Sequence, residues 1–175
     1  RVVAITAAMP DGTGLIDFRK RWPNRCFDVG IAESVAVDVA AGMAAQGLRP
    51  LVCIYSTFLQ RSYDPIFQEV ALQNLPVAFC IDRAGLVGND GPTHHGLTDI
   101  GFLRMMPNLE ILAPACEAEL RAALDYAVTA DRSVAIRYPR DIIINGRIEE
   151  VALSRPLEGG RGVVLREGAS KLVLV

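Results

Sequence analysis

Short apolar runs rich in β-branched residues alternate with longer helical patterns along this chain. The runs lie at 2–6, 25–29, 51–55, 77–82, 109–114 and 134–138, and the candidate helices lie near 14–20, 33–46, 58–73, 98–105 and 117–129. Nearly continuous apolar strands that alternate with helices are typical of a parallel sheet buried on both faces. The pattern therefore predicts an α/β fold, a doubly wound, mostly parallel sheet with helices on both faces, whose ligands bind beyond the carboxyl ends of the strands.

The composition indicates a globular domain whose ligand is a small molecule. Of the 175 residues, 51% are apolar and 22% are charged, which is enough for a sizeable core. A net charge of −2 and the lack of any Lys/Arg-rich block argue against a nucleic-acid partner or an anionic membrane surface. No apolar run approaches the roughly 18 residues of a membrane span, so we expect no membrane partner.

The four cysteines are far apart in the sequence, at Cys26, Cys53, Cys80 and Cys116. Three of them lie in apolar, strand-like runs, which favours buried thiols over disulfides or metal ligands. Free thiols suit a reducing compartment, so we expect a cytoplasmic protein.

Both ends of the sequence have the character of strand interiors, RVVAIT at the start and KLVLV at the end. We therefore expect a piece of a longer protein. The composition changes after Arg140, and turn signals stand at Asn145-Gly146 and Gly159-Gly160. This predicts one domain over 1–140, followed by a linker with a hairpin-like extension over 141–175 that leads into a further domain.

Polar and aromatic side chains follow four of the predicted strands, and parallel strands bring their carboxyl ends to one edge of the sheet. They are Glu33, then Tyr55, Phe58 and Arg61, then Arg83, Asp90, His94 and His95, and finally Arg140. This convergence is the main functional signal in the pattern of the sequence.

Each of these residues also has a purely structural interpretation. A glutamate in the first turn of a helix is favoured by the helix dipole. The apolar neighbours of Glu33, however, predict burial. A buried carboxylate without a partner lowers stability, so its presence indicates a function. Tyr55 and Phe58 fit ordinary packing, and Arg61 on an exposed helix face would be solvated.

The paired histidines stand in a loop with four glycines, so one of them is expected to face the site. No cysteine or carboxylate lies at zinc-ligand spacing from them on the same element, and we expect no metal site on this chain. Arg83 and Arg140 either pair with neighbouring aspartates or grip a phosphate bidentately. Neither GxxxxGK[ST] nor a GxGxxG turn is present, so arginines would have to hold any phosphorylated ligand.

Four longer segments carry a more specific signal: FDVGIAESVAVDVAAGMAAQGLRP, IYSTFLQRSYDPIFQEVALQNLPV, IDRAGLVGNDGPTHHG and AIRYPR. Together they resemble the central, pyrimidine-binding domain of the 1-deoxy-D-xylulose-5-phosphate synthases, thiamin-diphosphate enzymes related to transketolase. The resemblance implies a transferase that joins pyruvate to D-glyceraldehyde 3-phosphate with loss of carbon dioxide. This reaction opens the non-mevalonate route to isoprenoids and also feeds thiamin and pyridoxal biosynthesis.

The resemblance also implies roles for the strand-end residues. Glu33 would hydrogen-bond N1′ of the cofactor's aminopyrimidine, Phe58 would lie against the face of that ring, and Tyr55 and Arg61 would surround it. His94 would exchange protons with the reacting substrates. The acceptor pocket would be lined by Tyr55, Arg83, Asp90, His94 and Arg140.

The sequence departs from the family in two respects. Ser34-Val35 stands where the family usually has Gln-His, and the GDG-and-Asn motif that binds the diphosphate through Mg²⁺ is missing. By resemblance that motif belongs to an N-terminal domain absent from this chain, so we expect the segment alone to be inactive and the whole protein to be a homodimer.

Two other interpretations stay open at this point. The chain could be the pyrimidine-domain subunit of a split transketolase or of a 2-oxo acid dehydrogenase, although YSTFLQR and THHG argue against this. It could also be a non-catalytic α/β binding module whose strand-end residues are structural.

Overall fold

The computed structural model describes residues 1–142, so the extension predicted from 141 onward falls almost entirely outside the described residues. The strands are β1 (Val2–Thr6), β2 (Cys26–Asp28), β3 (Arg49–Tyr55), β4 (Ala78–Asp82), β5 (Leu109–Leu112) and β6 (Ser133–Arg137). The α-helices are α1 (Ile16–Arg21), α2 (Glu33–Ala45), α3 (Ser56–Leu59), α4 (Tyr63–Pro65), α5 (Asp99–Leu103) and α6 (Glu117–Thr129). Shorter turns are η1 (Pro23–Arg25), η2 (Gln60–Ser62), the π-helical η3 (Ile66–Ala71), η4 (Gly88–Asp90) and η5 (Pro92–His94).

All six strands pair in parallel, in the order β2-β1-β3-β4-β6-β5. The segments that follow β1 and β3 pack on opposite faces of the sheet, because Leu15 contacts one buried cluster and Leu59 another. Neighbouring strands whose connections leave in opposite directions create a crevice at their carboxyl ends. The predicted doubly wound, parallel fold is confirmed, and the crevice lies at the edge where the candidate site residues were expected.

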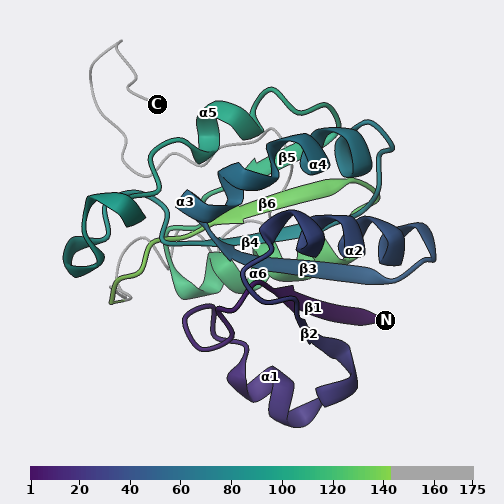
Figure 1. The fold of residues 1–175 in the computed structure, drawn as a ribbon, viewed down its shortest axis with the longest axis horizontal. Helices are drawn as coiled ribbons and strands as arrows, with labels where there is room; N and C mark the ends of the chain where they lie inside the picture. The colour runs from purple at the N-terminus through teal and green to yellow at the C-terminus, as the bar shows by residue number, and fades with distance from the viewer. Residues whose placement is uncertain (143–175) are drawn as a thin grey trace, which may run out of the picture.

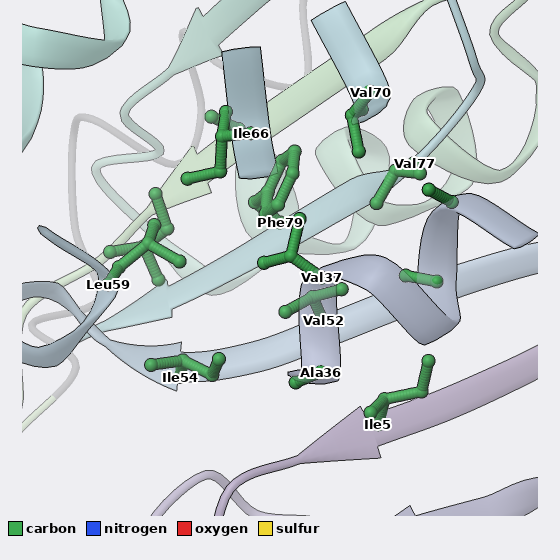
Figure 2. Close-up of a cluster of buried hydrophobic side chains, with 14 of the residues drawn as sticks. Ile5, Ala36, Val37, Val52, Ile54, Leu59, Ile66, Val70, Val77 and Phe79 are labelled. Carbon is green, nitrogen blue, oxygen red and sulfur yellow. The ribbon is translucent and has the colours of Figure 1, made fainter. Parts of the chain in front are cut away.

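The main core lies between the sheet and the layer formed by α2, α3, η3 and α5 (Figure 1). Alanines of α2 such as Ala36 and Ala40 are fully buried, and their small side chains let this helix lie close to the sheet. Figure 2 shows the ring of Phe79 on β4 between Val37 of α2 and Ile66 and Val70 of η3.

The opposite face is covered by α1 and α6 (Figure 1). Ala123 and Ala127 of α6 pack on Val134 and Ile136 of β6. Cys53 and Cys80 are buried near Leu15, at paired positions of β3 and β4. All four cysteines are free thiols. The predicted burial is confirmed for Cys53, Cys80 and Cys116, whereas Cys26 is only partly buried.

One predicted helix is broken into several pieces. The segment expected as a helix near 58–73 starts earlier, at Ser56, and passes through α3, η2, α4 and η3 before it ends. Pro65 is one cause, because proline has no N–H to donate to the carbonyl four residues earlier, that of Arg61. The helical pattern was correct, but the change of winding was not visible in the apolar periodicity.

Replacement of Phe79 by alanine should lower the free energy of unfolding by about 3–5 kcal/mol, because the ring is completely buried and its removal leaves a cavity. Urea unfolding of the 175-residue chain, followed by circular dichroism, measures this change. Leu72→Ala is the control, because Leu72 is 52% exposed and its loss should cost less than about 0.5 kcal/mol. Equal effects of the two substitutions would contradict this account of the core.

Candidate active site

The carboxyl edge of the sheet gathers the eight residues to which the resemblance assigns roles. Glu33 begins α2 after β2, Tyr55 ends β3, Arg83 follows β4 and Arg140 follows β6. The remaining four lie on the short helical turns beside these strands: Phe58 on α3, Arg61 on η2, Asp90 on η4 and His94 on η5.

The carboxylate of Glu33 is buried and ion-paired. The residue is 5% exposed, and Nη1 of Arg61 donates to its Oε1 at 2.6 Å. The sequence predicted this burial but not the partner, because the structural interpretation of Arg61 was a solvated side chain. The side chain of Arg61 is half exposed, and it neutralises the carboxylate although the two residues are 28 positions apart in the sequence.

Aromatic rings and guanidinium groups form a continuous row from Arg61 to Arg83. The Cζ atom of Arg61 lies 5.0 Å from the centroid of the Phe58 ring, and the rings of Phe58 and Tyr55 are stacked at 5.8 Å. The Cζ atom of Arg83 lies 3.5 Å from the centroid of Tyr55. Contacts of this kind are favourable and directional, so they fix the relative positions of the four side chains.

Arg83 is buried among carboxylates. Its Nη1 donates to Asp82 at 2.7 Å and to the backbone carbonyl of Gly12 at 3.3 Å, and its Nε donates to Asp90 at 3.0 Å. Its backbone is in the left-handed region, with φ of 62°. Asp90 also accepts from Arg140. Pairing with aspartates, one of the two interpretations left open by the sequence, is therefore present in the structure.

The two aspartates differ in their acidity. Burial raises the pKa of Asp82, and the nearby guanidinium of Arg83 only partly opposes this. The pKa of Asp90 is lowered, chiefly by the hydrogen bond from Arg140 and also by the one from Arg83. Asp90 thus remains a carboxylate that binds the two arginines together.

An open cleft of about 680 Å³ lies beside this network. It is lined by the loop after β1, Ala8 to Gly12, together with Tyr55, Arg83 and Arg140. The side chain of Arg140 is 54% exposed, and a guanidinium carries five N–H donors. The cleft is therefore large enough for a small molecule and offers cationic donors for an anionic group.

The two histidines have different surroundings. Nδ1 of His95 accepts from the backbone N–H of Val87 at 3.2 Å. His95 thus stabilises the loop from Gly85 to Gly96, called the glycine loop below, by a contact inside the loop. The ring of His94 lies edge-on to Phe58 at 5.3 Å, and its Nδ1 is 2.9 Å from Oγ1 of Thr93. Of the two, His94 is the one at the aromatic row.

The glycine loop is closed at its base by two backbone hydrogen bonds between Gly85 and Gly96, at 2.8 and 2.9 Å. A Cβ atom at Gly96 would lie 2.3 Å from the carbonyl oxygen of Arg83 and 2.5 Å from Oγ of Ser56. Gly96 is therefore required by the close approach of three chain segments. The hydroxyl of Thr57 also donates to the carbonyl of Thr93 at 3.0 Å, which ties the loop to α3.

Two supporting side chains were not identified from the sequence. Oδ1 of Asp28 accepts from the N–H groups of Ala8 and Gly30, at 2.8 and 3.1 Å, and thereby joins the cleft loop to the turn that precedes Glu33. Arg137 makes a bidentate pair with the buried Asp99, with distances of 3.0 and 3.2 Å. Only the position of Asp28 and Arg137 at strand ends could have indicated them.

Within residues 1–142, no three His, Cys, Asp or Glu side chains gather as metal ligands would. None of the helices in the same range is long and apolar enough to span a membrane.

Residues 1–144 match a family model described as "Transketolase, pyrimidine binding domain". The 1-deoxy-D-xylulose-5-phosphate synthase of Oleidesulfovibrio alaskensis is 57% identical over 174 residues, which are 99% of this chain and 27% of that protein. The 1-deoxy-D-xylulose-5-phosphate synthase 1 of Geobacter sulfurreducens is 54% identical over 168 residues, 96% of this chain and 26% of that protein. The chain thus spans about a quarter of the length of these curated relatives.

Solved structures show the same fold. A split-gene transketolase, described as an inactive beta4 tetramer, superposes with a TM-score of 0.80 at 30% identity, over 95% of this chain and 52% of that one. Transketolase from Leishmania mexicana superposes with a TM-score of 0.70 at 21% identity, over 80% of this chain and 22% of that one.

Replacement of Gly96 by alanine should destabilise the chain by about 1–3 kcal/mol, because the added methyl group overlaps backbone and Ser56. Gly101→Ala is the matched control. A Cβ there meets nothing within 4 Å, and alanine in a helix should stabilise by up to about 1 kcal/mol. Urea unfolding of both variants should give changes of opposite sign; a neutral Gly96→Ala would show that the loop does not need this close approach.

The depressed pKa of Asp90 makes its ion pairs sensitive to acid. Their stabilisation is complete above the ordinary aspartate pKa of about 3.9 and is lost as the pH falls through the lower pKa of the folded state. Arg140→Ala should raise the pKa of Asp90, whereas Arg121→Ala, at an exposed helix pair, should not. Side-chain ¹³C NMR during an acid titration measures this. An identical Asp90 titration in both variants would contradict the assignment of the shift to Arg140.

Proposed function

The chain belongs to the transketolase pyrimidine-binding domain family, in its 1-deoxy-D-xylulose-5-phosphate synthase branch, and on this premise we propose that it forms the pyrimidine-binding part of a thiamin-diphosphate site in such a synthase. The proposed reaction breaks the bond between the carboxylate and the carbonyl carbon of pyruvate and releases carbon dioxide. A new bond then joins that carbonyl carbon to the aldehyde carbon of D-glyceraldehyde 3-phosphate, and the aldehyde oxygen takes up a proton.

The observation that carries the proposal is the buried carboxylate of Glu33, whose ion-pair partner Arg61 lies over the ring of Phe58. An aminopyrimidine is a flat ring with hydrogen-bonding atoms on its edge, so it needs an apolar surface and a fixed acceptor. Phe58 provides the surface, and Arg61 orients the carboxylate through Oε1. Within residues 1–142, Oε2 of Glu33 has no hydrogen-bond partner, which leaves it available to the ring. The residues present therefore fit the cofactor.

The cofactor, when bound, supplies the electron sink for the decarboxylation. Glu33 would hold its pyrimidine ring at N1′, while Phe58, Tyr55 and Arg61 surround the ring. A water-poor position strengthens the hydrogen bond of the carboxylate. These side chains are already held in place by their mutual contacts, so little ordering is left to occur on binding.

The acceptor would occupy the cleft lined by Tyr55, Arg83 and Arg140. Arg140 can donate to the phosphate without leaving Asp90, because a guanidinium has several donors. His94, at the edge of Phe58, would exchange a proton with the acceptor's oxygen.

Mg²⁺ and the diphosphate would be held by a part of the protein outside this chain. We place the protein in the cytoplasm as a homodimer, and exposed apolar side chains such as Ile31 and Leu97 are in keeping with a surface that is covered in an assembly.

A second candidate is the pyrimidine-domain subunit of a split enzyme. It is favoured by the superposition on a split-gene transketolase. The gene that encodes this chain distinguishes the two, because a GDG-and-Asn segment would be encoded upstream on the same chain in the synthase and on a separate chain in the split enzyme.

The test of the proposed function is an assay of the full-length protein with thiamin diphosphate, Mg²⁺, pyruvate and D-glyceraldehyde 3-phosphate. Glu33→Ala should reduce the formation of deoxyxylulose phosphate by about 10²–10⁴-fold, the usual range for loss of a proton-transfer group. Glu117→Ala, at an exposed carboxylate, is the control and should keep the wild-type rate. Wild-type turnover by Glu33→Ala would remove Glu33 from the site, and no product from a cofactor-bound wild type would exclude the synthase activity.

A further inference from the structure

Two consecutive side chains of α2 hold the same arginine. Glu33 binds the guanidinium of Arg61 at 2.6 Å, and the hydroxyl of Ser34 donates to the backbone carbonyl of Arg61 at 3.1 Å. The first bond fixes the end of the arginine side chain, and the second fixes its point of attachment on η2. The start of α2 is thereby joined to η2 at two points 27 and 28 residues away in sequence.

The carbonyl of Arg61 lies where the helical winding changes. Ser62, the next residue, has φ of −104° and ψ of 21°, so the chain leaves the helical path between η2 and α4. Pro65, four residues after Arg61, has no N–H that could donate to this carbonyl. The hydroxyl of Ser34 donates to it instead.

We propose that Ser34 is a positioning residue that fixes the backbone of Arg61 at this change of winding, and that it thereby sets Arg61 against Glu33 and Phe58 for the aminopyrimidine ring. The inference rests on the proposed function for the identity of the ligand. Ser34 stands at a position where the sequence departs from the synthase pattern.

The consequence for binding follows from the contacts of Arg61. Its Cζ atom lies over the Phe58 ring at 5.0 Å, and its Nη1 holds Oε1 of Glu33. A shift of η2 therefore moves Arg61 relative to both the Glu33 carboxylate and the Phe58 ring. Loss of the Ser34 hydroxyl should weaken cofactor binding without removing any group that contacts the cofactor.

The test is the dissociation constant of thiamin diphosphate, measured by isothermal titration calorimetry on the full-length protein with Mg²⁺. Ser34→Ala should raise this constant about two- to tenfold, the equivalent of one hydrogen bond. Ser34→Thr keeps the hydroxyl and should restore wild-type affinity. Thr129→Ala, which removes an exposed hydroxyl from the end of α6, is the control and should have no effect.

A double-mutant cycle with Arg61→Ala separates this role from a general structural one. Without the Arg61 side chain the hydroxyl has nothing to position, so Ser34→Ala should cost less affinity in the Arg61→Ala background than in the wild type. An equal cost in both backgrounds, or unchanged affinity in Ser34→Ala, would overturn the inference. A wild-type protein that binds no thiamin diphosphate would instead overturn the proposed function on which it rests.

Discussion

The buried guanidinium of Arg83 joins the parts of the carboxyl edge to one another. It pairs with Asp82 at the end of β4 and with Asp90 in the glycine loop, it donates to the carbonyl of Gly12 in the loop after β1, and it lies on the ring of Tyr55 at the end of β3. A buried cation without partners is strongly unfavourable. Because these partners come from four separate segments, neutralising this one charge requires the segments to meet, and their meeting shapes the cleft.

The parallel sheet explains why such a network can form at all. Six parallel strands bring all their carboxyl ends to one edge, and the crossing of connections between β1 and β3 opens a crevice there. Core packing fixes the strands, most clearly around Phe79 (Figure 2). The row of Arg61, Phe58, Tyr55 and Arg83 then runs along this edge, from the carboxylate of Glu33 to the cleft. Cofactor and acceptor positions in the proposed function are therefore neighbouring parts of one prearranged surface.

The fold class was predictable from the sequence, since apolar runs and helical periods report burial directly and the strand ends follow from them. Burial of Glu33 was predictable for the same reason. The partners of the charged residues were not, because the Glu33–Arg61 and Arg83–Gly12 contacts join residues 28 and 71 positions apart and depend on the packed structure. The left-handed backbone of Arg83 likewise depends on tertiary packing. Ser34 was recognised as a departure from the family pattern, but its contact with Arg61 became visible only in the folded chain.

The central claim is that Glu33 and the aromatic row receive the pyrimidine ring of thiamin diphosphate. A crystal structure of the full-length protein with the cofactor and Mg²⁺ tests it most directly. We expect N1′ of the ring within hydrogen-bonding distance of the Glu33 carboxylate, about 2.6–3.2 Å, with the ring face against Phe58 and Arg61 still paired with Glu33. A pyrimidine ring bound elsewhere, with Glu33 still held by Arg61 alone, would contradict the account.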